Sequence, residues 1–351
     1  MNRSKILTEF KLCLGDRCRL INLPPLYVLF TPSDLLFRLS DVGDSDSFIY
    51  RFLVKRKNLD IPADSSKLRI SQKSFRFVLE HFDLSPSFIS AFTQLHLPSG
   101  RGFIPATPAL KCTKVKLWYV LPVRVQVACS DKAKGHASST SGSNQMDPFH
   151  YLHLSEAEVD IRGSHIAVAS EYALGGTNSK TVSFNFMDGR WSKSVEEPEN
   201  RLLEALHHAE KLQSNEDPFF IHTIYFSSGI RWFMNALSSV NAQLIAFEKE
   251  LQKQIDEQMA EKSASYNMIN RALHSIAAHL HRYGTELGAT QNILKDLMAA
   301  HAQYQSTCIN DESFSGATTA FKFVESQLNE TCVFLQELEV KLQNILALVS
   351  L

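Results

Sequence analysis

The last third of the chain carries apolar residues at alternating intervals of three and four positions. This spacing places them along one side of a helix and is typical of helices that pack lengthwise on one another. We call these apolar positions the seam. The first run of seam residues is Ile230, Phe233, Leu237, Val240, Leu244, Phe247 and Leu251. The second is Tyr266, Ile269, Leu273, Ile276, Leu280, Tyr283 and Leu287, and the third is Phe321, Val324, Leu328, Leu335, Leu338, Leu342, Ile345 and Val349.

Three long helices are therefore predicted, the first starting near Ser227 and the second covering about residues 261–305. Thr331 takes one position of the third run. At 1.5 Å per residue the second helix would be roughly 65 Å long. A helix of this length must cover its seam by packing on its neighbours or on the same helices of other subunits. We expect a coiled coil and a homo-oligomer. The seam residues expected at contacts between helices, within one copy or between copies, are Leu237, Val240, Leu244, Phe247, Leu251, Leu335, Leu338, Leu342 and Ile345.

The first two thirds alternate short apolar runs with turn-forming residues, and strands outnumber helices. The strongest strand signal covers residues 116–129, where Pro122 should mark an edge or a bulge. Further strands are expected at 48–54, 149–154, 159–172 and 181–186, with turns at 162–163 and 175–176. A short helix should start at Ser85, an amphipathic helix should cover 196–213, and residues 219–226 should form a last strand or a linker. The prediction is an α+β fold, with a strand-rich α/β head at 1–220 and three long helices at 221–351.

Net charge and cysteine spacing indicate which classes of function and which cellular compartment to expect. The formal net charge is −1, so no overall positive field favours binding to nucleic acid. The six cysteines form no Cys-x-x-Cys pair, and no apolar leader follows the N-terminus. No run of about 18 apolar residues is present. We therefore expect a cytoplasmic chain, with membrane association only through a continuation past Leu351 or through a partner.

Candidate chemistry is sparse. Asp147, His150 and His153 form the densest group of possible metal ligands, but residues three apart on a strand point to opposite faces. Asp256 and Glu257 on the first long helix are weak candidates for Mg²⁺, which prefers oxygen ligands. No nucleophile, base and oxyanion donor can be assembled, so an enzyme is not expected.

Several segments resemble the cytosolic part of CorA-type magnesium transporters, in particular the divergent CorA-like proteins of fungi. They are LPVRVQV at 121–127, SNQMDPFHYLHL at 143–154, VDIRG at 159–163, DGRW at 188–191 and EEPEN at 196–200. The order of a mixed head, a helical hairpin and another long helix adds to the resemblance. In that family the last of these helices leads into the membrane, and five subunits surround the pore.

The resemblance implies a regulatory and oligomerising part of a divalent-cation transporter, with Mg²⁺ as a weakly bound regulator. The family's two membrane helices and its Gly-Met-Asn signature have no counterpart in these residues, so no pore residue can be carried over. We expect either a truncated transporter or a natural paralogue that assembles with itself or with a full-length relative. The alternative is a coiled-coil interaction protein with an α+β binding head and no role with ions.

Overall fold

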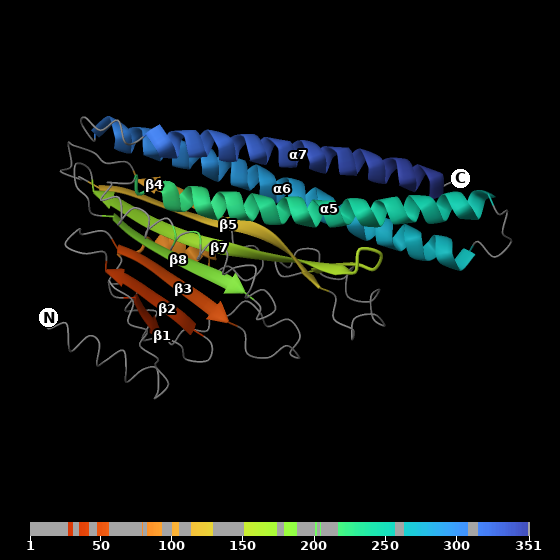
Figure 1. Ribbon diagram of the computed structural model, residues 1–351, viewed down its shortest axis with the longest axis horizontal. Helices are drawn as coiled ribbons and strands as arrows, with labels where there is room; N and C mark the ends of the chain where they lie inside the picture. Colours follow the sequence, from red (N-terminus) through yellow and green to blue (C-terminus); the bar gives the residue numbers. More distant parts are fainter. Residues whose placement is uncertain are drawn as a thin grey trace. The chain divides into compact units, whose positions relative to one another are not determined.

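A computed structural model of residues 1–351 has an α+β fold, with strands in the N-terminal half and long helices after them (Figure 1). The residues that the structure describes are 27–30, 35–41, 48–55, 79, 83–92, 100–104, 114–128, 151–173, 179–187, 201, 204, 217–256, 263–307 and 315–349. This confirms the fold class predicted from the sequence. The amphipathic helix expected at 196–213 lies mostly outside the described residues.

By its internal contacts the chain divides into two compact units. Unit 1 contains Met1–Leu121, His165–Ile221 and Ile293–Thr319, and unit 2 contains Pro122–Ser164, His222–Asn292 and Ala320–Leu351. Strands and long helices therefore contribute to both units. The helical part of the chain begins at Phe220, whereas the division into a head at 1–220 and a helical domain at 221–351 stays a prediction.

The described strands form one sheet with the order β1-β2-β3-β8-β7-β5-β4, and β6 pairs with β7. The elements are β1 (Tyr27–Phe30), β2 (Leu35–Asp41), β3 (Phe48–Lys55), β4 (Gly100–Ile104), β5 (Lys114–Ala128), β6 (Tyr151–Leu154), β7 (Val159–Ala173) and β8 (Ser179–Met187). Strand β3 runs parallel to β8, with Phe48 opposite Lys180, while β1–β2, β2–β3, β4–β5, β6–β7 and β7–β8 are antiparallel.

Two features of the central strands bear on the sequence predictions. The register of β4 on β5 ends where Gly100 faces Val120. Pro122 therefore lies beyond this pairing, as expected of a residue that cannot donate to the sheet ladder. The turn predicted at residues 162–163 is wrong, because β7 continues from Val159 to Ala173 without a break. The chain turns instead at residues 155–158, where Glu158 has a φ of 52°.

The C-terminal helices of the described chain are α5 (Phe220–Asp256), α6 (Ser263–Thr307) and α7 (Ser315–Val349), and the short α3 (Pro86–Phe92) precedes β4. Residues 219–226 form no strand or linker, which corrects the sequence prediction. Asp217 caps α5: its Oδ1 accepts a hydrogen bond from the Phe219 amide at 3.0 Å, and its carbonyl accepts one from the Phe220 amide. Pro218 follows at the first position, where a missing N–H costs nothing.

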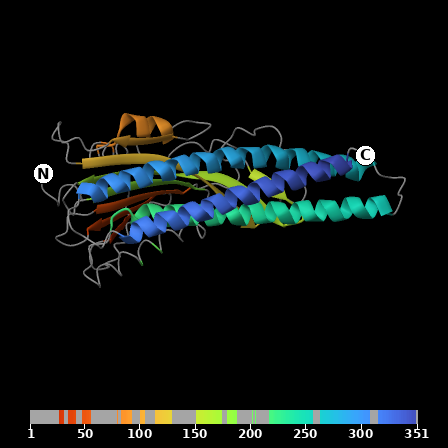
Figure 2. The same cartoon turned by 90° about the horizontal axis from the view of Figure 1, so that it is seen from above.

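In unit 2 the three helices lie lengthwise beside one another (Figure 2). Phe233 of α5 meets Tyr283 of α6 edge-on, with ring centroids 6.1 Å apart. Along α6 and α7 the contacts run in opposite order, from Gly284 with Leu335 to Gln291 with Asn329, so these two helices are antiparallel. The structure buries the nine seam residues expected at helix contacts, and Thr331 with them.

Close packing explains one glycine of this layer. A Cβ atom at Gly284 would lie 3.3 Å from Cδ2 of Leu335, so an alanine there would require the Leu335 side chain to move by a few tenths of an ångström.

Within the part of the chain that the structure describes, no helix is both long enough and apolar enough to cross a membrane.

Candidate functional site

The structure describes two of the five candidate metal ligands. His153 lies on β6 and Asp256 at the exposed end of α5, whereas Asp147, His150 and Glu257 lie outside the described residues. Among the described residues, no group of three or more His, Cys, Asp or Glu side chains could hold a metal ion. Each candidate therefore remains a prediction from the sequence.

His153 has a carboxylate partner on the neighbouring strand. Its Nδ1 lies 2.8 Å from Oδ1 of Asp160, which faces it in the β6–β7 register, and Arg162 approaches Asp160 at 3.6 Å. Both side chains of the His153–Asp160 pair are buried. The pair joins the two strands of the hairpin, next to the turn where the Glu156 amide donates to Oε1 of Gln243 on α5 at 2.9 Å.

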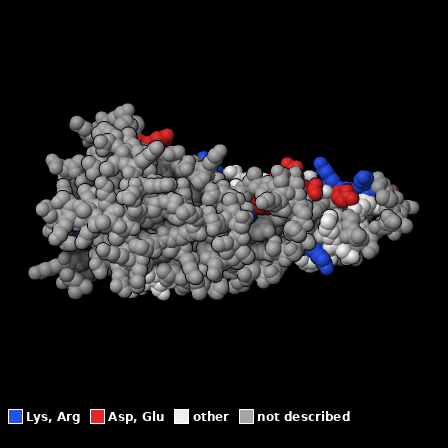
Figure 3. Space-filling view, turned by 90° about the horizontal axis from the view of Figure 1, so that it is seen from below, with Lys and Arg blue, Asp and Glu red and all other residues white. Residues whose placement is uncertain are grey.

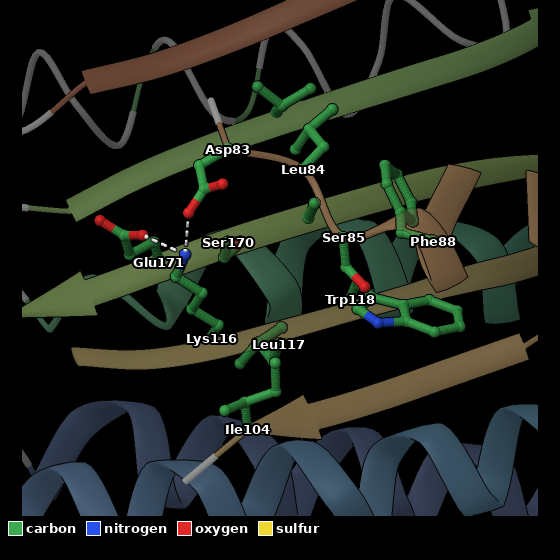
Figure 4. A pocket seen from close by; sticks show the side chains of 12 residues that line it. Asp83, Leu84, Ser85, Phe88, Ile104, Lys116, Leu117, Trp118, Ser170 and Glu171 are labelled. Carbon is green, nitrogen blue, oxygen red and sulfur yellow. Dashed lines mark hydrogen bonds and ion pairs between the residues drawn. The ribbon is translucent and has the colours of Figure 1, made fainter. Parts of the chain in front are cut away.

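A small hollow of unit 1 contains an alternating chain of charges (Figure 4). Nζ of Lys116 lies 2.6 Å from Asp83 and 3.2 Å from Glu171, and Lys114 reaches the other oxygen of Glu171 at 2.5 Å. The hydrogen bond with Asp83 raises the pKa of Lys116 and lowers that of the aspartate. Burial acts to raise the pKa of Glu171, but the two lysines outweigh it and lower the pKa.

Ser85 and Trp118 line this hollow, and each constrains the backbone of a neighbouring segment. Ser85 Oγ accepts a hydrogen bond from the Ser87 amide at 3.3 Å and starts α3, as the sequence predicts. The Trp118 ring covers Gly102, where a Cβ atom would lie 2.3 Å from Nε1 of the indole. The hollow measures about 440 Å³ including open solvent. Its charged lining residues are Asp83, Lys116 and Glu171, and Lys114 contacts Glu171 from outside the lining.

A second polar group of unit 1 is buried among aromatic rings. Asp217, the cap of α5, pairs through Oδ2 with Nε2 of His301 on α6, and both side chains are buried. Phe219 lies 5.1 Å from the His301 ring and stacks on Tyr172 of β7 with centroids 4.3 Å apart. Tyr304 packs on both Phe219 and Tyr172. One carboxylate therefore holds the start of α5 to α6 beside the sheet.

The most deeply buried charge that the structure describes belongs to unit 2. Arg124 of β5 is 1% exposed and binds Glu286 of α6 with two hydrogen bonds, from Nε to Oε2 at 2.7 Å and from Nη2 to Oε1. Arg282 donates to the same Oε1 at 2.9 Å, and the Arg124 guanidinium lies 4.8 Å above the Tyr283 ring. Burial acts to raise the pKa of Glu286, but the two guanidinium groups lower it below its ordinary value.

Neither buried pair was predicted from the sequence. Arg124 and Glu286 are 162 positions apart, and Asp217 and His301 are 84 apart. The only local signals are a single arginine within an apolar strand and an Asp-Pro dipeptide before an apolar run. The second of these is a helix-start signal that identifies Asp217 as a cap.

Helix α7 carries four exposed large apolar side chains outside its seam, two of them opposite the seam and two to one side of it. Phe323, Val333, Val340 and Leu348 are 61%, 54%, 62% and 38% exposed. Val333 and Val340 are seven residues apart and lie opposite the buried seam at 100° per residue. We call these four residues the outer stripe of α7.

On the face of the molecule drawn in Figure 3, the described acidic and basic side chains are interspersed rather than separated by sign.

The comparisons with known proteins concern the fold alone. The chain is similar to the cytoplasmic domain of ZntB from Vibrio parahaemolyticus RIMD 2210633, with 9% identity and a TM-score of 0.42, over 90% of this chain and 97% of that domain. It is also similar to the soluble domain of CorA from Methanocaldococcus jannaschii, with 8% identity and a TM-score of 0.44, over 88% and 91% of the two chains. No protein-family model and no curated protein matches the chain. Because these identities and TM-scores are low, the function is inferred from the residues of this chain.

Proposed function

We propose that the chain is the regulatory and oligomerising part of a CorA-like divalent-cation transporter, with Mg²⁺ as the cation and no catalytic activity. The proposal combines the order of elements with the segments that resemble the family. Residues 121–127 and 159–163 belong to β5 and β7, the long strands of the sheet. The sheet is followed by α5, α6 and α7, which is the order that the resemblance implies.

The observation that carries the oligomeric part of the proposal is the outer stripe of α7. Val333 and Val340 repeat at the heptad interval, and the exposed Ala347 continues it. Covering a valine, leucine or phenylalanine fully contributes roughly 1.5–3 kcal/mol per side chain. A second helix with the same repeat fits such a stripe, and a second copy of this chain supplies one. The partner is therefore another copy or a full-length relative that carries the same helix.

Charge on the outer stripe should disrupt this assembly. We expect the V333E/V340E variant to elute as a monomer in size-exclusion chromatography with light scattering, while the unchanged chain elutes as an oligomer. The matched control is M268E/T285E, which adds the same charges at exposed positions of α6. An oligomer of unchanged mass in V333E/V340E, or a monomeric wild-type chain, would refute self-assembly through α7.

The cation role is tested separately on the same protein. If Mg²⁺ regulates the chain, millimolar Mg²⁺ should change its pattern of limited proteolysis relative to EDTA, and equal ionic strength supplied as NaCl should not. An oligomer whose proteolysis ignores Mg²⁺ would support the alternative function, a coiled-coil interaction protein with an α+β binding head. In the transporter reading the chain is cytoplasmic, and it meets the membrane only through a further segment or a full-length partner.

A further inference from the structure

The contact between β5 and α6 in unit 2 differs in kind from the contacts between the helices. The helices meet through seam residues such as Leu237, Leu280 and Leu335, which are buried and apolar. Strand β5 meets α6 through Arg124, which reaches Tyr283 and Glu286. A charged contact that is buried as deeply as a core residue requires a reason other than burial of apolar surface.

The polar groups at this contact are not all satisfied. Arg124 and Arg282 both donate to the carboxylate of Glu286. Nη1 of Arg124 and the hydroxyl of Tyr283 are buried and have no hydrogen-bond partner among the residues that the structure describes. A buried ion pair with unsatisfied donors contributes little net stability compared with apolar side chains of the same size. Stability alone therefore does not explain the pair.

The geometry of the Arg124–Glu286 pair restricts how α6 can align with β5. Two parallel hydrogen bonds between a guanidinium and a carboxylate fix both position and orientation. A shift of α6 by one turn toward either end would bring Arg282, Tyr283, Ala289 or Thr290 opposite Arg124. None of these side chains carries a carboxylate, and one is a second arginine. Each shifted arrangement would leave Arg124 buried without a counter-charge, which is strongly unfavourable.

We propose that the Arg124–Glu286 pair fixes the register of α6 against β5 by excluding arrangements of the helix shifted by one turn. The seam alone does not exclude them, because its apolar residues repeat along α6 and offer similar contacts after a shift. Arg124 and Glu286 are positioning residues in this role. The inference is independent of the proposed function, because it concerns the packing of α6 on β5 and not the binding of a cation.

The test measures register directly in the full chain. Spin labels are introduced as non-canonical amino acids at Gln126 of β5 and His274 of α6, both exposed, because the native cysteines would react with thiol-directed labels. Labelled chain is mixed with an excess of unlabelled chain, so that only distances within one copy are seen. Pulsed electron resonance then compares the unchanged pair with R124M/E286L, in which apolar side chains of similar size replace it.

The unchanged pair should give one narrow distance distribution. R124M/E286L should add a second population displaced by about 5 Å, the pitch of one helical turn. The control K341M/E248Q removes an ion pair at 3.8 Å between a half-buried lysine of α7 and an exposed glutamate of α5, and it should keep one population. A single narrow distribution in R124M/E286L would overturn the proposal.

A second variant covers the case in which R124M/E286L does not fold. The exchange R124E/E286R, combined with R282Q so that a shifted helix offers no guanidinium at that position, again places one carboxylate opposite one guanidinium, so it should restore the single distance of the unchanged chain. Two populations in the folded exchange variant would overturn the proposal just as directly.

Discussion

Replacing Asp217 with alanine removes two buried interactions of unit 1 at once. The first is the cap of α5, in which Oδ1 accepts the Phe219 amide at 3.0 Å. Losing a side-chain cap costs roughly 0.5–2 kcal/mol. The second is the hydrogen bond between Oδ2 and His301, and losing a bond to a charged group costs roughly 1.5–3 kcal/mol. D217A should therefore lower the free energy of unfolding by about 2–5 kcal/mol.

Two further variants separate these contributions. D217N keeps an oxygen for the Phe219 amide but loses the charge opposite His301, so it should be less destabilised than D217A. S85A removes the cap of the short helix α3, an exposed bond of 3.3 Å, and should cost about 1 kcal/mol or less. Urea unfolding followed by circular dichroism measures all three. A loss in D217A no larger than that in S85A would refute the assignment of Asp217 as the contact that holds the start of α5.

The remaining predictions concern buried polar groups elsewhere. E286Q should cost roughly 3–5 kcal/mol in urea and R124M clearly less, because only the first leaves the guanidinium buried without a counter-charge; equal losses would contradict this. T331V should raise the midpoint of thermal unfolding and add up to about 1 kcal/mol to the free energy of unfolding, since Thr331 occupies a fully buried seam position. A lower midpoint would contradict this prediction. Burial lowers the pKa of His165 to about 3, whereas a histidine of the unfolded chain takes up its proton near pH 6.5. The free energy of unfolding should therefore fall as the pH drops from about 6.5 toward 3, by about 1.4 kcal/mol per pH unit. H165L should flatten this slope between pH 7 and pH 5, and the exposed-site control H281Q should retain it.

The long helices were predictable because their pattern is local and repeated. Each seam run covers more than five helical turns, which no strand reproduces. The start of α5 was not predicted, because aromatic and β-branched residues at 219–226 favour a strand when considered locally. Burial of Phe219, Ile221 and Phe226 in the fold overrides that preference. The Asp217–Pro218 dipeptide was the signal that favoured a helix.

The buried ion pairs could not be predicted from local patterns. Arg124 follows Val123 in an apolar strand, and nothing within the strand indicates that its partner lies on α6. Glu286 lies beside the seam position Leu287, so the heptad pattern treats it as a flanking residue. Such a pairing depends on which strand packs against which helix face, and that is a property of the tertiary fold.

Sedimentation velocity of the full chain in Mg²⁺ and in EDTA at equal ionic strength tests the proposed regulatory role most directly. We predict an oligomer whose sedimentation coefficient differs between the two conditions, because subunits that assemble through α7 would respond to the cation. A monomer in both conditions, or an oligomer with the same coefficient in both, would contradict the proposed role as the regulatory part of a cation transporter.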